Sequence, residues 1–505
     1  MSRNSSATDA FPPKPILEFS FWLQNPVRHI FGNSLARHFL KQLTDECPIC
    51  GTSVIKSEVT ASMGGNATQK CKRCKRVKKS LSFFQSVAKI FTGKELLWEP
   101  LLAFPVSRGV KANEPQAFSR AVQVILRGIA IYGMRRPLTT SAPLTFFWEF
   151  TGLCNLNCLY CYARDKRVPY DELTTDECLR LIDELSEAGV VSVTFSGGEP
   201  LMRKDFFEVA SYAAKKGIVV FLATNGTLIT KDTAKKLKEI GVEYAEISID
   251  SATKEAHEAF RGLGTFDKAV NAVKYCVEEG IPLVGIATTL TAKNEAIDET
   301  LKFAKELGAN QVVFLNYVPA RGATGNLELD MDPYEREKAI KQILETRENY
   351  KCFKRVAILQ ATYTARISRE MAREKGSGLK QIGFIDVDDP QMSRLFNFMG
   401  GCGAARTMAA MTPNGDITPC TLLPVKLGNV REDKFIDVWT NSQILADLRD
   451  RKNWKGRCGR CRYKIVCGGA RCRAYAYFED YLAPDPACTL NADLLATEGR
   501  KLSTK

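Results

Sequence analysis

The chain has 505 residues, of which 45% are hydrophobic and 25% charged, a composition that is typical of a soluble globular protein and excludes a membrane-spanning one. This length suits about three domains of ordinary size. The 17 cysteines are odd in number and lie in tight clusters, and residues 1–15 form no hydrophobic signal segment. We therefore expect a reducing cytosol and metal ligation, not a disulfide framework. With three histidines, histidine-based catalysis is not expected.

The net charge of +14 is concentrated at one end of the chain. Residues 1–150 contain 21 Lys and Arg against 9 Asp and Glu, which gives this segment a charge of +12 and leaves the remainder almost neutral. A basic lobe attached to a neutral body indicates an anionic partner. A membrane surface, a nucleic acid and an acidic protein all fit that description.

The first 140 residues contain several apolar segments with basic flanks. Residues 16–24 are rich in aromatic side chains, and residues 27–43 carry apolar side chains at helical spacing with Arg and Lys between them. Residues 81–91, 96–106 and 121–132 are also apolar. None approaches the ~20 uninterrupted apolar residues needed to cross a bilayer. Two interpretations remain open: an amphipathic anchor that lies on a membrane surface, or packing against the rest of the chain.

Two Cys-x2-Cys pairs lie between these segments. Cys47 and Cys50 form the first pair, and Cys71 and Cys74 form the second, with twenty residues between the pairs. Each pair offers two thiolates, so two pairs complete a tetrahedral metal site. Zinc and rubredoxin-like iron both fit, because thiolate spacing does not choose between them. We expect a structural role for this metal.

From residue 144 onward, strand and helix patterns alternate at intervals of roughly 30 residues, as in βα units around a parallel sheet. Thr174 and Glu177 form a capping box, and Gly189, Gly217 and Gly241 lie where helix C-terminal caps are needed. Six such units are too few for a closed eight-stranded barrel. The predicted strands cover residues 144–150, 190–195, 218–223, 242–249, 282–289 and 311–317.

Three cysteines follow the first of these strands. Cys154, Cys158 and Cys161 place three thiolates within eight residues, and soft sulfur ligands of this kind hold iron-sulfur clusters. A 4Fe-4S cube has four irons, so this loop leaves one iron without a protein ligand. A zinc site or a disulfide staple is the alternative, but no fourth cysteine lies nearby in the sequence.

These cysteines, with Tyr160 before the last of them, resemble the signature of the radical S-adenosylmethionine (SAM) enzymes. The resemblance implies that the open iron chelates the amino and carboxylate groups of SAM. It further implies that an electron from the cluster cleaves SAM to methionine and a 5'-deoxyadenosyl radical. The fold it implies is α/β, an open, partial (β/α)6 barrel with active residues at the carboxyl ends of the strands.

A glycine-rich turn after the second predicted strand fits the same family. Gly197, Gly198, Glu199 and Pro200 match the family's GGEP motif, and Gly197 comes 36 residues after Cys161. Two glycines let the backbone approach a ligand closely, and a carboxylate can accept hydrogen bonds from an ammonium group. By resemblance, that ammonium belongs to the methionine end of SAM.

Polar residues also follow the third and fourth predicted strands. Asn225, Ser248 and Asp250 carry amide, hydroxyl and carboxylate groups suited to the ribose hydroxyls of SAM, although Asn225 alternatively only shapes its turn. Arg261 resembles an arginine that related enzymes place near the SAM carboxylate.

The C-terminal region is again defined by cysteine. Seven cysteines between residues 402 and 488 resemble the SPASM extension of radical SAM enzymes, which carries auxiliary 4Fe-4S clusters. By this resemblance, Cys458, Cys461, Cys467 and Cys488 enclose one cluster, and Cys402, Cys420 and Cys472 bind another that lacks an obvious fourth thiolate. Four residues separate Cys467 from Cys472, where three are usual in the family. Zinc knuckles are the alternative.

These motifs divide the chain into five regions. The predicted regions are a basic helix-rich lobe at 1–140 with its metal knuckle at 47–74, a radical SAM barrel at 141–322, a helical connector at 323–400, a SPASM domain at 401–490 and a tail at 491–505.

The predicted function is SAM-dependent radical modification of an unactivated C–H position in a large substrate, either as an oxidoreductase or in C–C or C–S bond formation. The basic lobe favours a membrane-associated substrate such as a lipid chain. The alternative is a peptide, protein or cofactor maturase, and a third hypothesis is a non-catalytic metal- or nucleic-acid-binding adaptor.

The expected partners follow from the same interpretation. They are an electron donor such as ferredoxin or flavodoxin, a lipid or peptide substrate and an anionic membrane surface, whereas nucleic acid is not expected. The expected location is cytoplasmic, with peripheral contact to a membrane.

Overall fold

The computed structural model describes residues 115–133, 136–163, 171–323, 326–375, 381–382, 385–386 and 400–494. Four of the predicted apolar segments, 16–24, 27–43, 81–91 and 96–106, lie outside the described residues. The same holds for the predicted metal knuckle of Cys47, Cys50, Cys71 and Cys74, which therefore stays a prediction.

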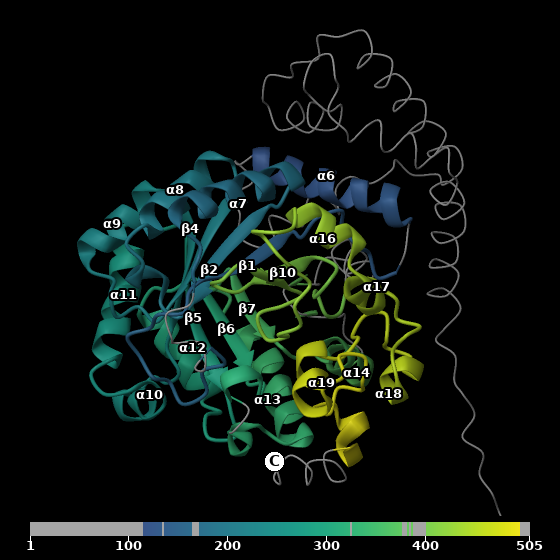
Figure 1. Ribbon diagram of the computed structural model, residues 1–505. Coiled ribbons are helices and arrows are strands. Elements are labelled where there is room, and N and C mark those ends of the chain that lie inside the picture. Colours follow the sequence, from purple (N-terminus) through teal and green to yellow (C-terminus); the bar gives the residue numbers. More distant parts are fainter. Residues whose placement is uncertain are drawn as a thin grey trace, which may run out of the picture.

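A ten-stranded sheet organises the described part of the chain (Figure 1). Seven strands lie side by side in chain order and pair in parallel. They are β1 (Thr145–Thr151), β2 (Ser192–Gly197), β3 (Val219–Thr224), β4 (Val242–Ser248), β5 (Leu283–Leu290), β6 (Gln311–Asn316) and β7 (Arg355–Leu359). On the other side of β1, β10 (Met408–Met411) pairs in parallel, and β11 (Asp416–Thr418) and β12 (Gly428–Asn429) continue the sheet antiparallel. A separate short hairpin consists of β8 (Gln381–Ile382) and β9 (Ile385–Asp386).

The predicted parallel α/β fold is confirmed, and the six predicted strands correspond to β1–β6 with ends shifted by at most two residues. The number of parallel strands predicted, six, was nevertheless too low. Strand β7 comes from the region predicted as a helical connector, and β10 comes from the C-terminal cysteine-rich region. Both edges of the predicted barrel sheet are thus extended by strands that sequence patterns did not reveal.

Helices connect the parallel strands and cover the outer face of the sheet (Figure 1). The helices between β1 and β7 are α7 (Thr175–Ala188), α8 (Phe206–Lys215), α9 (Lys231–Glu239), α10 (Lys254–Arg261), α11 (Phe266–Glu278), α12 (Ile297–Glu306) and α13 (Pro333–Thr346). The capping box is confirmed, since the Thr174 side chain accepts from the Glu177 backbone and the Glu177 side chain accepts from the Thr174 backbone. Gly189 ends α7 in the left-handed conformation, with φ of 90°.

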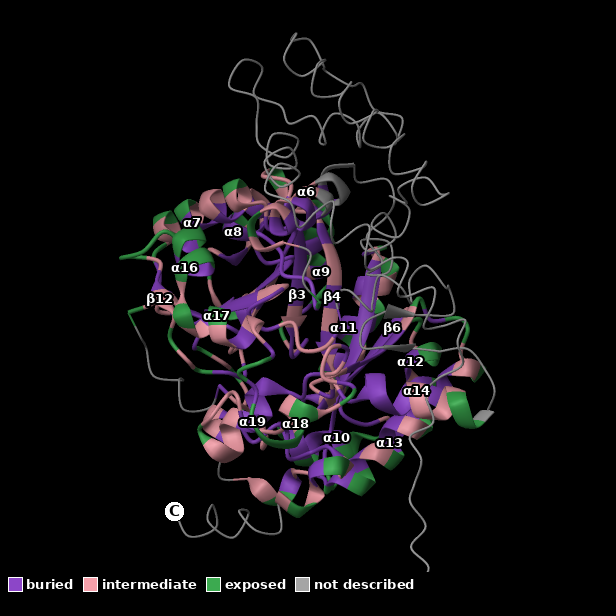
Figure 2. Ribbon diagram, turned by 90° about the vertical axis from the view of Figure 1, so that its right-hand side faces the viewer, coloured by how far each residue is buried: buried purple, intermediate pink, exposed green. Residues whose placement is uncertain are grey.

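Aromatic side chains of β1 occupy the centre of the core. Phe146, Trp148 and Phe150 alternate along the strand and are fully buried. Because alternate residues of a strand point to the same face, these three rings pack together against the helices. The ring of Phe195 in β2 lies 5.5 Å from Trp148 and 5.2 Å from Phe150. Figure 2 shows the strands of the sheet as mostly buried, with exposed residues on the helices and in the loops.

Helix α6 (Pro115–Tyr132) packs into this same core. Ala121, Val124, Ile125 and Ile129 lie at helical spacing and are buried. Of the two interpretations of residues 121–132, core packing is therefore confirmed. The boundary predicted at residue 140 does not separate α6 from the barrel core. None of the helices in the described part of the chain combines the length and hydropathy of a membrane span.

The C-terminal region packs on the β1 and β10 side of the sheet (Figure 1). The ring of Phe435 lies edge-on to Phe146 at 5.4 Å, and the Trp439 indole N–H donates to the Thr140 carbonyl at 3.2 Å. These contacts make the cysteine-rich region part of the same packed body as the barrel. Its helices are α16 (Phe435–Asn441), α17 (Gln443–Arg449), α18 (Gly456–Arg460) and α19 (Arg471–Phe478), and α14 (Thr364–Lys375) precedes the region in the chain.

Candidate active site and auxiliary metal sites

The three-cysteine loop leaves the carboxyl end of β1, as predicted. Cys154, Cys158 and Cys161 are partly exposed and form no disulfide. The Cys154 sulfur accepts a hydrogen bond from the Leu156 backbone at 3.4 Å. Burial raises the pKa of the Cys158 thiol to about 11, and the nearby Arg261 guanidinium opposes this rise. Three thiols outside any disulfide therefore lie on one short loop, where a metal cluster can be bound.

The glycine-rich turn after β2 is hydrogen-bonded directly to that loop. The Gly198 N–H donates to the Thr151 carbonyl at 2.8 Å, and the Glu199 N–H donates to the Leu153 carbonyl at 2.7 Å. A Cβ atom on Gly198 would lie 1.9 Å from the Leu153 oxygen, and Gly197 has a φ of +119°. Both positions therefore require glycine, because the turn backbone lies against the cysteine loop. Pro200 follows as the first residue of a short 3-10 helix (Pro200–Met202).

The Glu199 carboxylate is fully buried and already has three donors from the chain. One oxygen accepts from the Thr224 hydroxyl at 2.8 Å and the Leu201 N–H at 3.2 Å, and the other accepts from the Asn225 N–H at 2.9 Å. Burial nevertheless raises the pKa of Glu199 to about 7. In this structure Glu199 ties the ends of β2 and β3 together. Its predicted contact with the ammonium group of SAM stays a prediction.

Asn225 also contacts the cysteine loop. Its amide N–H2 donates to the side-chain oxygen of Asn155 at 2.9 Å, and its oxygen accepts from the Thr227 N–H at 2.9 Å. Asn155 in turn donates to the Thr227 hydroxyl at 2.8 Å. Asn225 thus shapes its turn and fixes the loop at the same time. Sequence reasoning missed Asn155, although it lies between Cys154 and Cys158.

Asp250 brings three of the predicted site residues together. Its carboxylate accepts from the Arg261 Nε–H at 2.6 Å and from the Tyr160 hydroxyl. It also accepts from the Thr289 N–H at 3.0 Å. Burial lowers the pKa of Arg261, but the charges of Asp250 and Tyr160 outweigh this and raise the net value. Asp250 therefore connects Arg261 to Tyr160 of the cysteine loop, and its contact with ribose stays a prediction.

Ser248 is the last residue of β4 and is half-buried. Within the described residues, its hydroxyl forms no hydrogen bond. Of the polar groups predicted to contact the SAM ribose, this hydroxyl is therefore the one that the fold leaves open to a ligand.

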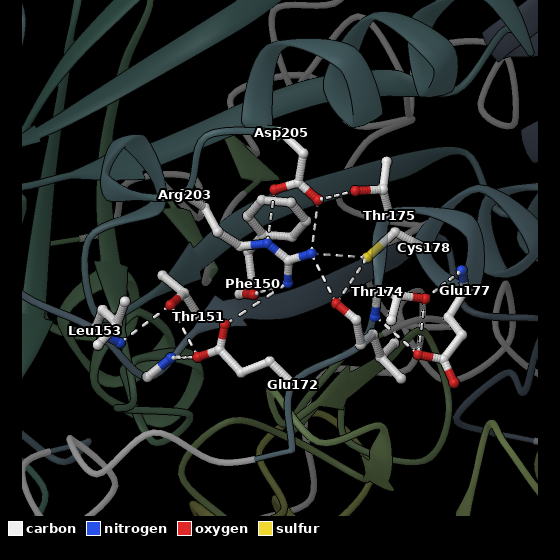
Figure 3. A network of polar contacts seen from close by, with 12 residues as sticks. Phe150, Thr151, Leu153, Glu172, Thr174, Thr175, Glu177, Cys178, Arg203 and Asp205 are labelled. Carbon is white, nitrogen blue, oxygen red and sulfur yellow. Dashed lines mark hydrogen bonds and ion pairs between the residues drawn. The ribbon is translucent and has the colours of Figure 1, made fainter.

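Arg203 is a site residue that sequence reasoning missed (Figure 3). Its guanidinium donates to both Asp205 oxygens at 2.7–2.8 Å and to the Phe150 carbonyl at 3.0 Å. Glu172, 3.8 Å from the guanidinium, accepts from the Thr151 hydroxyl at 2.9 Å and the Gly152 N–H at 2.7 Å. Arg203 thereby fixes the point where β1 gives way to the cysteine loop. Its position three residues after Pro200 of the glycine-rich turn is the feature of the sequence that could have indicated its role.

A second missed arginine links the barrel to the C-terminal region. The Arg321 guanidinium pairs with both oxygens of Glu149 on β1, the second at 2.8 Å, and both side chains are buried. It also donates to the Thr421 carbonyl at 2.7 Å, next to the predicted ligand Cys420. The guanidinium lies over the ring of Tyr162 at 5.3 Å. One side chain thus joins β1, the cysteine loop and an auxiliary-site loop.

Cys458, Cys461, Cys467 and Cys488, the predicted ligands of one auxiliary cluster, line a single pocket with an empty volume of about 440 Å³ that is partly open to solvent. Backbone N–H groups donate to three of the sulfurs at 3.4 Å: Asp485 to Cys458, Tyr463 to Cys461 and Gly469 to Cys467. Donors of this kind stabilise thiolates that ligate iron-sulfur clusters.

The spacing of these thiols differs from that of a mononuclear metal site. Among the described residues, no three His, Cys, Asp or Glu side chains converge closely enough to hold one metal ion. A cube takes each thiolate at a separate corner, so four cysteines spread over the wall of one pocket fit a cluster.

Cys402, Cys420 and Cys472 also lie close together. Burial raises the pKa of the Cys472 thiol, and the neighbouring thiols of Cys420 and Cys402 raise it further. Burial raises the pKa of Cys420 to about 11, with Cys402 adding to the rise. Cys472 therefore lies with its predicted partners despite the longer spacing after Cys467. Ligation by these three residues stays a prediction.

This arrangement defines a radical SAM enzyme. The radical SAM superfamily model matches residues 148–304, and the SPASM model, an iron-sulfur cluster-binding domain, matches residues 402–462. The chain belongs to the radical SAM superfamily and carries a C-terminal SPASM domain. It binds SAM and 4Fe-4S clusters as that family does.

Curated relatives match over most of their length. The AdoMet-dependent heme synthase of Methanosarcina barkeri is 37% identical over 354 residues, covering 69% of this chain and 97% of the relative. The Fe-coproporphyrin III synthase of the same organism is 32% identical, covering 68% and 88%. The mycofactocin maturase MftC of Mycobacterium tuberculosis is 30% identical, covering 69% and 83%.

The solved structures confirm the fold. SuiB of Streptococcus suis, bound to S-adenosylmethionine, superposes with a TM-score of 0.59 at 18% identity, covering 82% of this chain and 89% of SuiB.

Proposed function

We propose that the chain is a radical SAM/SPASM maturase that modifies a side chain of a tetrapyrrole cofactor precursor. The observation that carries this proposal is the 37% identity to an AdoMet-dependent heme synthase across 97% of that relative. The Fe-coproporphyrin III synthase supports the same substrate class. Of the predicted functions, the maturase alternative is therefore better supported than modification of a lipid.

The contacts of the site support the radical chemistry. When bound, the cluster at Cys154, Cys158 and Cys161 supplies the electron that cleaves SAM to the 5'-deoxyadenosyl radical. The chain's own part is to hold that loop against β2 and β3 through Gly198, Glu199 and Asn225. Such rigid placement confines a reactive radical to the bound substrate.

A modified peptide is the second candidate substrate. The 30% identity to the mycofactocin maturase, across 83% of that relative, favours it. A tetrapyrrole carries several carboxylates on a rigid ring, whereas a peptide needs an extended groove. A tetrapyrrole and a peptide therefore require binding sites of different shape. An assay with each substrate distinguishes the two candidates.

The proposed function includes neither a lipid substrate nor a membrane surface. They depended on the basic segments before residue 115, which lie outside the described residues. Residues 121–132, the segment that is described, pack into the barrel core. An electron donor such as ferredoxin or flavodoxin remains part of the proposal, because reductive SAM cleavage requires one.

The test is an anaerobic assay of the reconstituted full chain with SAM and a reductant. Fe-coproporphyrin III and a mycofactocin precursor peptide are supplied separately, and mass spectrometry measures 5'-deoxyadenosine and the mass of each substrate. We expect 5'-deoxyadenosine to rise together with a mass change in the porphyrin. The Cys158→Ala variant, which lacks one cluster ligand, should give neither.

Other outcomes would contradict the proposal. A mass change in the peptide alone would replace the tetrapyrrole by the second candidate. SAM cleavage without any change in the porphyrin, at full iron content, would exclude that porphyrin as the substrate.

A further inference from the structure

Arg366 of α14 lies in the wall of the pocket formed by Cys458, Cys461, Cys467 and Cys488. It is 4% exposed, so its charge is held in an environment of low dielectric constant. Burial raises the pKa of the Cys488 thiol, and the nearby Arg366 guanidinium opposes this rise. A buried positive charge next to a cluster ligand affects the redox potential of that cluster.

A clamp of carboxylates holds this guanidinium in place. Arg366 Nη1 donates to Glu370 at 2.5 Å, and Nη2 pairs with Glu337. Nη2 also donates to the Thr489 hydroxyl at 3.0 Å, and that hydroxyl donates to Glu337 at 2.8 Å. Thr489 directly follows Cys488. The clamp therefore joins α13, α14 and the chain segment of the ligand, and fixes the charge relative to the sulfur.

One nitrogen of the Arg366 guanidinium, Nε, takes no part in these hydrogen bonds. Its Nε–H is buried and has no hydrogen-bond partner within the described structure. Leaving a buried charged donor without a partner is costly, so such groups usually have an acceptor in the functional state. Because Arg366 lines the pocket, the sulfur atoms of a bound cluster are suitable acceptors.

We propose that Arg366, clamped by Glu337, Glu370 and Thr489, sets the redox potential of the auxiliary cluster at Cys458, Cys461, Cys467 and Cys488. Reduction adds a negative charge to the cluster, and a nearby fixed positive charge stabilises the reduced form. Arg366 is a positioning residue in this role and does not react itself. The inference is independent of whether the substrate is a tetrapyrrole or a peptide.

The test is an EPR-monitored redox titration of the reconstituted full chain. Cys154, Cys158 and Cys161 are changed to Ala in every variant, so that the SAM-site cluster does not contribute. The signal of interest is identified by its loss in Cys488→Ala. We expect the midpoint potential of Arg366→Gln to be more negative than that of the protein with Arg366. The midpoint potential of Arg366→Lys, which keeps the positive charge, should lie close to the original value.

A matched control separates charge from helix stability. Arg373 lies on the same helix but is exposed, so Arg373→Gln should leave the midpoint unchanged. Glu370→Gln removes a negative charge from the clamp and should move the midpoint in the positive direction. This positive shift tests whether charge sets the midpoint potential, even when the Arg366→Gln variant does not bind a cluster.

Two results would overturn the proposal. One is an unchanged midpoint in both Arg366→Gln and Glu370→Gln at normal iron content. The other is an equal negative shift in Arg366→Gln and Arg366→Lys, which would assign the effect to packing and not to charge.

Discussion

At the scale of single residues, the site depends on a few buried charged groups that hold other site residues. Asp250 is fully buried, and its carboxylate binds Arg261, Tyr160 and the backbone of Thr289. A buried pair of this kind is costly to break, because the surviving charge has lost both its partner and its water. Its main contribution is to connect Arg261 to Tyr160 of the three-cysteine loop.

Replacement of Asp250 by Asn should therefore destabilise the protein strongly. Arg261 would keep its charge without a carboxylate partner, and we expect the free energy of unfolding to fall by about 3–5 kcal/mol. Urea unfolding of the full chain measures this. The control is Asp267→Asn, whose partner Lys254 lies at 2.5 Å with both side chains about half exposed or more. That pair should contribute less than about 1 kcal/mol, and equal losses in the two variants would contradict the expectation.

Glu199 should make stability depend on pH. Burial raises its pKa from the ordinary 4.5 to about 7, so the folded chain binds this proton more tightly than the unfolded chain. The free energy of unfolding should therefore fall as the pH rises from about 4.5 to about 7, by about 3 kcal/mol in total. Glu199→Gln cannot ionise and should lack that decline. Urea unfolding at pH 5, 6, 7 and 8 compares the two proteins, and parallel profiles would rule the effect out.

At the scale of elements, the glycine turn after β2 acts as a support for the cysteine loop. Gly198 accepts no side chain, because its Cβ would lie 1.9 Å from the Leu153 oxygen. We expect Gly198→Ala to displace the loop and to remove the SAM-dependent EPR signal, while the auxiliary clusters remain. Iron analysis and EPR of the reconstituted variant measure both.

A second glycine provides the control for that substitution. Gly280, after α11, has a φ of +71°, but no atom lies within 4 Å of the position that a Cβ would take there. Gly280→Ala carries backbone strain without a clash near the loop, so its SAM-dependent signal should be normal. Loss of that signal in both variants would mean that general instability, and not the loop contact, is responsible.

At the scale of the whole molecule, buried contacts make the barrel and the cysteine-rich region one body. Arg321 joins Glu149 of β1 to the Thr421 carbonyl beside Cys420. Arg321→Gln leaves Glu149 buried and unpaired, and we expect a loss of about 3–5 kcal/mol together with separate unfolding of the two regions. In the wild type, circular dichroism and cluster absorbance should report one common unfolding transition. In Arg321→Gln they should report two separate transitions.

Another arginine makes a weaker connection between the same regions and serves as the comparison. Arg431 pairs with Asp171 and Glu177 at 2.7 Å, in a more exposed setting than Arg321. Arg431→Gln should cost less than about 1 kcal/mol and leave the transitions coincident. Coincident transitions in Arg321→Gln would show that other contacts join the two regions.

The sequence predicted what depends on local pattern. Strands β1–β6, the capping box of Thr174 and the three-cysteine loop follow from periodicity and spacing, which neighbouring residues set. Strand β10 has four residues rich in Ala and Met and no distinctive pattern, and its pairing with β1 depends on packing across more than 250 residues. The Glu149–Arg321 pair spans 172 residues, so no local signal could reveal it.

EPR spectroscopy of the reduced full chain, with and without SAM, tests most directly whether the cysteine loop holds the SAM-binding cluster. SAM should change the spectrum of the wild type and of Cys488→Ala. It should have no effect when Cys154, Cys158 and Cys161 are all replaced by Ala. A wild-type spectrum that SAM leaves unaltered, or the same change in the triple variant, would contradict the assignment of SAM binding to this loop.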